Sequence, residues 1–274
     1  MAYFETKDGL RLFYRDWGTG KPVVLVHGWC INSDSWEYVQ GELPNHSLRC
    51  ISYDQRGCGR SEQAWTQYDY DTLASDLEAL LDTLDLRDVT LAGHSLGSGV
   101  ITRYLARYGN ERIAKAVFVA GTTPLLVKTD DNLDGFDRSV LENSIAFMKR
   151  DRAAYIMSLV PSFFGADLPN DRVSQEMIDW AIGLTIQASP QAAVEMLRTC
   201  AMTDQRKELK EITTPTLIIH GDNDPGNPLE LTAQKTHALM PNSRLIVYEG
   251  ASHGFYIDMA ARLNQDLLAF INSE

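Results

Sequence analysis

The chain has 274 residues, of which 44% are hydrophobic and 23% are charged, and this composition is typical of a globular protein with a large buried core. The formal net charge of −12 would repel polyanions, which argues against a nucleic-acid partner and against an anionic membrane surface. The first residues lack the basic start and apolar core of a signal peptide, and no apolar run reaches membrane-spanning length, so we expect a cytoplasmic protein.

Strand and helix patterns alternate through the first part of the chain. Apolar and polar side chains alternate on both sides of Asp8-Gly9, which predicts an antiparallel hairpin. Continuous apolar runs predict strands that are covered on both faces. The expected strands are 3–6, 10–17, 23–26, 48–53 and 116–120, and the expected helices before residue 90 are 35–43 and 73–84.

The run from Val89 to Gly97 ends in Gly-x-Ser-x-Gly and passes directly into a helical pattern. The pentapeptide alone is a common loop sequence, but a buried strand before it and an amphipathic helix after it favour a nucleophile elbow. Gly93 and Gly97 leave room where strand and helix come closest, so the Ser95 hydroxyl can stand above the sheet edge. The free N–H groups at the start of the helix would favour an oxyanion there.

The alternation stops between Pro124 and Ile212, where helical patterns dominate at 139–148, 153–159, 174–186 and 190–200. We expect residues 124–212 to form a helical cap over a core made of residues 1–123 and 213–274. Seven large side chains of the cap could line a substrate pocket, although more than half are expected only to pack the cap: Phe147, Tyr155, Met157, Phe163, Phe164, Trp180 and Met196. Alternation then resumes with strands at 216–219 and 244–248 and helices at 229–239 and 257–271, which predicts an α/β protein with a mostly parallel sheet.

A serine nucleophile needs a base, and the base needs an acid to orient it. His253 follows the predicted strand 244–248, so a loop can carry its imidazole over the sheet edge. Asp222 and Asp224 follow the strand that ends at His220. The order Ser, Asp, His is that of the hydrolase triads built on a nucleophile elbow.

Eight motifs carry a resemblance to a known family: His27-Gly28-Trp29, Tyr53–Ser61, Tyr68–Ala74, Gly93–Gly97, Arg103–Gly109, Pro124–Asp130, Ile219–Asp224 and Glu249–Gly254. They span nearly the full length and keep the family's order. The whole chain resembles the α/β-hydrolase superfamily, and within it the cofactor-free haloperoxidase and aryl-esterase group. The resemblance implies an α/β-hydrolase fold with a mostly parallel eight-stranded sheet, helices on both faces and an inserted helical cap.

The resemblance also implies roles for single residues. Asp224 would be the triad acid beside Ser95 and His253, while Asp222 would brace its loop. The backbone N–H groups of Trp29 and Leu96 would form the oxyanion hole. The Trp29 side chain would line the acyl pocket or act as a packing wedge.

The remaining histidines and acidic residues have structural interpretations. His27 is expected to shape the oxyanion loop, His94 to pack beneath the elbow with a local hydrogen bond, and His220 to lie in the core. His46 and His237 are expected to be solvated.

The acidic residues Asp130, Asp131, Asp134 and Asp137 lack the glycine and terminal glutamate of a calcium-binding loop, so we expect a solvated cap entrance and no metal. The scattered cysteines Cys30, Cys50, Cys58 and Cys200 indicate reduced thiols.

The sequence departs from the group at two positions. Many peroxide-using members carry proline directly after His-Gly-Trp, where it would fix the backbone so that a carbonyl can accept a hydrogen bond from peroxide. This chain has Cys30 there, which favours plain ester hydrolysis. Ser98 stands where relatives tend to have glycine, without threatening the mechanism.

The sequence therefore predicts a serine hydrolase that cleaves small carboxylic esters or lactones through an acyl-enzyme, with no metal or organic cofactor. The expected partner is a small-molecule ester or lactone, and a homo-oligomer is possible. One alternative is a cofactor-free perhydrolase or haloperoxidase that uses the same triad. Another is a slow hydrolase-fold signal receptor, whose output is cap movement.

Overall fold

The computed structural model describes residues 2–165 and 169–273. A single sheet of eight strands runs through the centre in the order β1-β2-β4-β3-β5-β6-β7-β8, with β1 and β2 antiparallel and the rest parallel. The strands are β1 (Ala2–Glu5), β2 (Arg11–Trp17), β3 (Lys21–Val26), β4 (Leu48–Tyr53), β5 (Val89–His94), β6 (Ile113–Val119), β7 (Thr216–Gly221) and β8 (Ser243–Tyr248). The predicted fold class is confirmed.

Helices cover both faces of the sheet because its central strands are apolar on both sides. Val24 and Val26 pack into one hydrophobic cluster with the buried faces of α2 (Tyr70–Thr83) and α3 (Leu96–Tyr108). Val23 and Leu25 face the opposite cluster, which contains apolar side chains of α1 (Glu37–Gln40) and α12 (Ala260–Ile271). The continuous valine and leucine run is therefore the signature of a two-sided core.

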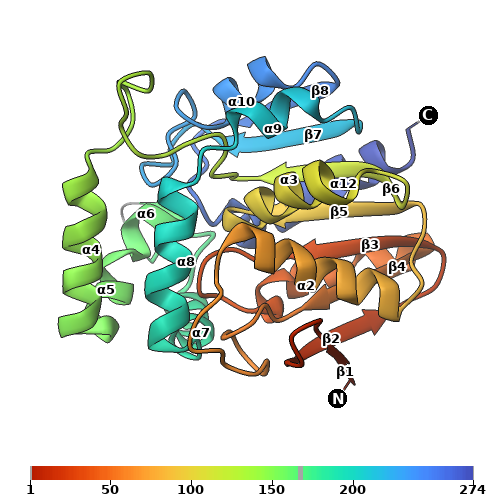
Figure 1. The fold of residues 1–274 in the computed structure, drawn as a ribbon, viewed down its shortest axis with the longest axis horizontal. Helices are drawn as coiled ribbons and strands as arrows, with labels where there is room; N and C mark the ends of the chain where they lie inside the picture. Colours follow the sequence, from red (N-terminus) through yellow and green to blue (C-terminus); the bar gives the residue numbers. More distant parts are fainter. Residues whose placement is uncertain (1, 166–168, 274) are drawn as a thin grey trace.

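Within the described residues, five of the six helices between β6 and β7 lie beyond the carboxyl ends of the parallel strands (Figure 1). They are α4 (Arg138–Arg150), α5 (Arg152–Ser158), α6 (Val160–Phe164), α7 (Gln175–Ile186) and α8 (Pro190–Met202). Because the active residues of such sheets lie at this edge, the helices are placed to cover them. The exact division into a core of 1–123 and 213–274 and a cap of 124–212 stays a prediction.

Several helix boundaries differ from the sequence expectations. The expected helix 35–43 is instead η1 (Ser33–Trp36), α1 and η2 (Leu43–His46). The expected helix 257–271 is divided into α11 (Phe255–Asp258) and α12, because Met259 has the non-helical angles φ −118° and ψ 26°.

The expected helix 229–239 starts only at Ala233, as α10 (Ala233–Leu239). A turn replaces its first residues, and the Thr232 hydroxyl donates to the Pro228 carbonyl at 2.8 Å. α6 and α9 (Arg206–Glu211) were not expected, because one or two turns are too short to show a period. Within the described ranges, no helix is long and apolar enough to span a bilayer.

Candidate active site

Ser95 lies at the tight turn between β5 and α3, where the sequence predicts the elbow. Its backbone angles are φ 53° and ψ −119°, a conformation that costs free energy in a residue other than glycine. The turn is possible only because two neighbours lack side chains. A Cβ on Gly93 would lie 2.5 Å from the Gly97 carbonyl carbon, and one on Gly97 would lie 2.5 Å from the Val26 carbonyl oxygen.

His253 and Asp224 come from two different loops and meet at the same edge of the sheet. Nδ1 of His253 lies 2.6 Å from Oδ2 of Asp224. The other carboxylate oxygen accepts the backbone N–H groups of Gly226 and Asn227 at 3.0 and 2.9 Å. Burial alone would raise the pKa of Asp224, but the facing imidazole and these hydrogen bonds hold it below its ordinary value. The carboxylate is therefore ionised and fixed in direction.

Asp222 has a different task from Asp224. Its side chain accepts the Gly250 N–H at 2.7 Å, so it braces the turn that leads toward His253. This is the arrangement expected from the sequence.

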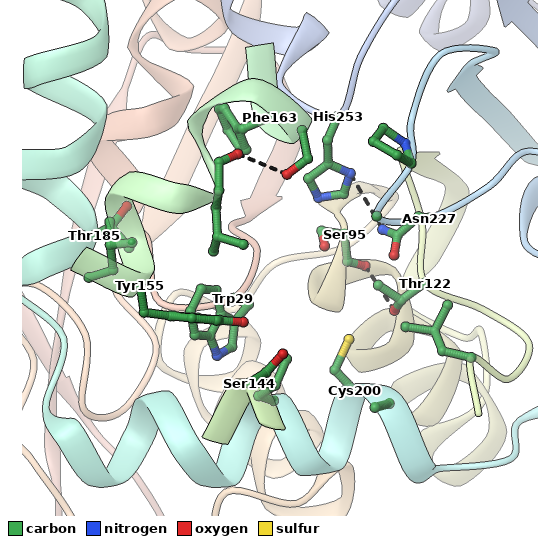
Figure 2. Close-up of a pocket in the computed structure, with 18 of the residues that line it drawn as sticks. Trp29, Ser95, Thr122, Ser144, Tyr155, Phe163, Thr185, Cys200, Asn227 and His253 are labelled. Carbon is green, nitrogen blue, oxygen red and sulfur yellow. Dashed lines mark hydrogen bonds between the residues drawn. The ribbon is translucent and has the colours of Figure 1, made fainter. Parts of the chain in front are cut away.

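Ser95 and His253 line one cavity of about 380 Å³ between the sheet edge and the cap. In Figure 2 the imidazole of His253 points toward Ser95. The structure thus brings Ser95 together with Asp224 and His253, which lie more than a hundred positions further along the sequence and 29 positions from each other. An imidazole held by a buried carboxylate and open to a serine hydroxyl on its other side can act as a general base.

The two predicted oxyanion donors come from the residue that follows Ser95 and from the loop that follows β3. Leu96 is the first residue of α3, so its N–H has no acceptor one turn back in the helix. Trp29 lines the cavity, and its indole N–H donates to the Ala193 carbonyl of α8 at 2.8 Å. The Trp29 side chain therefore both lines the pocket and ties its loop to the cap.

The backbone after Trp29 has an unusual conformation. Cys30 has φ +54°, and the Ile31 N–H donates to the Trp29 carbonyl at 2.8 Å across it. This closes a three-residue turn in which the Trp29 carbonyl already has a partner. Proline cannot adopt a positive φ, so the sequence departure at Cys30 coincides with a distinct local backbone.

His27 supports the same loop from inside. Its Nδ1–H donates to the Gly28 carbonyl at 2.8 Å, and its Nε2 accepts the Gln55 N–H at 2.9 Å. Burial lowers the pKa of His27, so the ring is neutral and both nitrogens are used. These contacts fit the expected role of shaping the loop.

The expectation for His94 is wrong in one respect. His94 does pack beneath the elbow, but its hydrogen bond is not local: Nε2 lies 3.2 Å from the carbonyl of His253. Its ring also lines the cavity. No spacing within the elbow could reveal this contact, because the partner lies 159 residues away.

The other histidines lie as expected. His220 is fully buried, and its Nε2–H donates to the Asn227 carbonyl at 2.7 Å. His46 and His237 are at the surface, where they contact Glu42 and Ser243.

The acidic cap segment forms ion pairs and a helix cap. Asp131 pairs with Arg206 at 3.0 Å, Asp134 pairs with Lys235 at 3.2 Å, and Asp137 caps α4 by accepting the Ser139 N–H. Among the residues that the structure describes, no group of three or more histidine, cysteine or carboxylate side chains could hold a metal ion.

The cavity wall is mostly apolar and comes from both the core and the cap. Of the seven large cap side chains considered from the sequence, three line it: Tyr155, Phe163 and Phe164. Hydroxyls of Thr122, Ser144, Ser162 and Thr185 and the thiol of Cys200 add scattered polarity. In the described part of the wall there is no lysine or arginine, and Asp137 is its one carboxylate.

Sequence reasoning missed Asn227. Its side-chain nitrogen lies 3.4 Å from Nδ1 of His253 and donates to the Ala120 carbonyl at 3.2 Å, while its N–H holds Asp224. Its contact with Asp224 could have been inferred in part from the sequence, because Asn227 follows Asp224 by three residues in a loop at the strand end.

A serine on a strained strand-to-helix turn, a carboxylate-held histidine and a capped parallel sheet together define a hydrolase of the nucleophile-elbow type. Comparisons with known proteins agree. Residues 21–260 match the family model described as "alpha/beta hydrolase fold". The chain therefore belongs to the α/β-hydrolase fold family, as the resemblance implied, and it is an enzyme of that superfamily.

The relatives include both esterases and haloperoxidases. The non-heme chloroperoxidase CPO-A1 of Kitasatospora aureofaciens is 37% identical over 99% of this chain and 100% of its own length. The bifunctional esterase/perhydrolase DCH of Acinetobacter calcoaceticus is 36% identical over the full length of both chains. The crystal structure of bromoperoxidase from Bacillus anthracis superposes with a TM-score of 0.95 at 38% identity, covering 99% of each chain. A serine hydrolase fits this set of relatives.

Proposed function

We propose that this enzyme is a carboxylic-ester hydrolase that acts on small neutral esters or lactones, with Ser95, His253 and Asp224 as its catalytic triad. One observation carries the proposal. The His253 imidazole, held by Asp224 at 2.6 Å, opens onto the same cavity as the strained Ser95. The roles below follow from this arrangement.

In the proposed reaction, the Ser95 hydroxyl oxygen attacks the ester carbonyl carbon while Nε2 of His253 takes its proton. The Trp29 and Leu96 N–H groups stabilise the oxyanion of the tetrahedral intermediate, and donors of this kind contribute a few kcal/mol each. His253 then returns the proton to the leaving alcohol, which leaves an acyl group on Ser95. Water, deprotonated by His253, releases the acid by the same steps in reverse.

The cavity supports a neutral, apolar substrate. Its described wall carries no cation that could neutralise a substrate carboxylate, and Asp137 would repel one. The net charge of −12 acts in the same direction at longer range. A small-molecule ester or lactone is therefore the proposed partner.

Perhydrolysis, in which hydrogen peroxide intercepts the acyl-enzyme, is the second candidate. It is favoured by the full-length similarity to an enzyme named esterase/perhydrolase. The turn at Cys30 argues for placing it second, because the Trp29 carbonyl is already engaged by the Ile31 N–H. A peroxide would have to share that acceptor with the Ile31 N–H.

The test is steady-state hydrolysis of a panel of p-nitrophenyl esters and lactones by the wild type, Ser95→Ala, His253→Ala and the control His237→Gln. His237 lies at the surface, away from the triad. We expect turnover of about 1 to 1000 per second for the wild type and the control, and loss of turnover in both triad variants without loss of fold. Retained hydrolysis in Ser95→Ala would refute the assignment, and wild-type turnover far below about one per second would favour a receptor.

A further inference from the structure

The peptide group that joins His253 to Gly254 is held at both ends. Its N–H, from Gly254, donates to the Phe163 carbonyl of α6 at 2.6 Å. Its C=O, from His253, lies 3.2 Å from Nε2 of His94. One contact comes from the cap and the other from the last residue of β5, directly before Ser95.

We propose that His94 is a positioning residue for the reaction assigned above: its Nε2–H holds the His253 carbonyl and so sets the place of the His253 imidazole relative to Ser95. The inference rests on the proposed function, because it gives His94 a task only if His253 acts on Ser95. Since His94 and Ser95 are neighbours in the chain, the strand that leads to the nucleophile Ser95 also positions the base His253.

The direction of the hydrogen bond follows from its chemistry. A carbonyl oxygen can only accept, so the proton must be on Nε2 of His94 and Nδ1 must be bare. His94 is 2% exposed, and burial together with the nearby His253 ring lowers its pKa well below the ordinary value. The ring is thus neutral and is held in one tautomer.

The opposite nitrogen of His94 is left without a partner. Nδ1 is buried and has no hydrogen-bond partner among the residues that the structure describes. It lies against Gly28, where a Cβ would come within 2.6 Å of it. A buried polar atom without a partner costs free energy, and an apolar side chain of similar shape would avoid that cost. A purely structural filler would therefore not need to be histidine.

Aromatic packing fixes the orientation of the His94 ring. It stacks on Tyr256 with ring centroids 4.1 Å apart and an interplanar angle of 30°. Its centroid is 4.7 Å from that of His253, and the rings of Trp36 and Phe163 meet it at steep angles. The donor is therefore aimed before substrate arrives, which is the property a positioning residue needs.

The experiment compares three replacements of His94, of which Gln and Met are nearly equal in length. His94→Gln keeps a donor near the place of Nε2, whereas His94→Met has none, and His94→Phe keeps the ring without the donor. His237→Gln serves as the control for loss of a histidine. We expect Met and Phe to lower kcat by roughly tenfold with KM within about twofold, since small misplacements of catalytic groups have effects of this order or larger. We expect Gln to recover most of kcat.

A second measurement does not depend on ester hydrolysis. The low-field proton resonance of the His253 Nδ1–H, assigned by its loss in His253→Ala, reports the bond to Asp224. We expect it to be sharp in the wild type and in His94→Gln, and shifted or broadened in His94→Met and His94→Phe.

Two results would overturn the inference. One is an unchanged kcat together with an unchanged His253 Nδ1–H resonance in His94→Met or His94→Phe. The other is an equal loss of kcat in His94→Gln and His94→Met. If Phe fails to fold, the Gln and Met pair decides. Failure of the proposed function has a different signature, because hydrolysis would then survive in Ser95→Ala, while the resonance still tests whether His94 positions His253.

Discussion

Nε2 of His220 lies 3.7 Å from Oδ2 of Asp224, so the carboxylate that holds His253 has a second buried histidine close by. His220 does not bond to that carboxylate, because its hydrogen bond goes to the Asn227 carbonyl at 2.7 Å. Asn227 in turn donates its own N–H to Asp224. The acid is therefore supported by a loop that is itself held from the end of β7.

Replacing Asp224 by Asn should separate catalysis from structure. We expect kcat to fall by on the order of 10⁴, because the amide can no longer hold the imidazole in the correct tautomer. The measurement is kcat for a p-nitrophenyl ester, with far-UV circular dichroism as the check on folding. A loss of less than tenfold would contradict the role of Asp224.

The lowered pKa of Asp224 predicts that the stability difference between the wild type and Asp224→Asn depends on pH. The pKa of Asp224 is lowered from 3.8 in the folded protein, so its contribution is complete above that value and is lost as the pH falls through the folded pKa. We expect the difference in unfolding free energy between wild type and Asp224→Asn to be constant near pH 6 and to shrink below pH 3.8. Urea unfolding at a series of pH values measures it, and a difference that grows on acidification would contradict the assignment.

Because the backbone of Ser95 is strained, we expect its replacement by glycine to abolish activity and to raise stability. Glycine adopts φ 53° without steric cost, so Ser95→Gly should stabilise the fold by about 1 kcal/mol relative to Ser95→Ala. Both variants lack the hydroxyl, so neither should hydrolyse esters. Thermal unfolding compares them, and equal melting temperatures would show that the turn stores no strain.

Cys30→Pro tests the order of the two candidate reactions. Because φ +54° is closed to proline, we expect the turn to open, the melting temperature to fall, and the ratio of perhydrolysis to hydrolysis in acetate buffer with peroxide to rise. Cys30→Gly, which tolerates the same φ, is the matched control and should keep the wild-type ratio. An unchanged ratio in the proline variant would remove the reason for placing perhydrolysis second.

Asp137→Asn tests the charge preference of the cavity. Asparagine keeps an acceptor for the Ser139 N–H, so the cap of α4 survives while the charge is lost. We expect kcat/KM for an anionic hemisuccinate ester to rise about two- to threefold, because the side chain is exposed and its field is screened. The neutral acetate ester should be unaffected, and a parallel change in both substrates would contradict the argument.

Local patterns in the sequence were enough to predict the strands of the sheet, its central helices, Ser95 and His253, whereas the choice of Asp224 over Asp222 came from the resemblance to the family. The run Val23–Val26 is apolar on both sides, the run Val89–Ala92 is apolar apart from Thr90, and the elbow carries its own glycines. The contact of His94 with His253 and the bond of Asn227 to Ala120 could not be predicted in this way, because each joins segments that become neighbours only in the folded chain. The positive φ of Cys30 was also hidden, since cysteine has no preference for it.

The indole bond from Trp29 to α8 connects the loop that carries one proposed oxyanion donor to a helix over the cavity. If α8 moves outward to admit a ligand, it pulls on the loop that carries one proposed oxyanion donor, and a shift of α6 would likewise release the peptide after His253. In the open state, the proposed oxyanion donor and His253 would then be out of position for the reaction. The catalytic groups would be aligned only when the cap is closed, and a water molecule that entered without a substrate would meet misaligned groups.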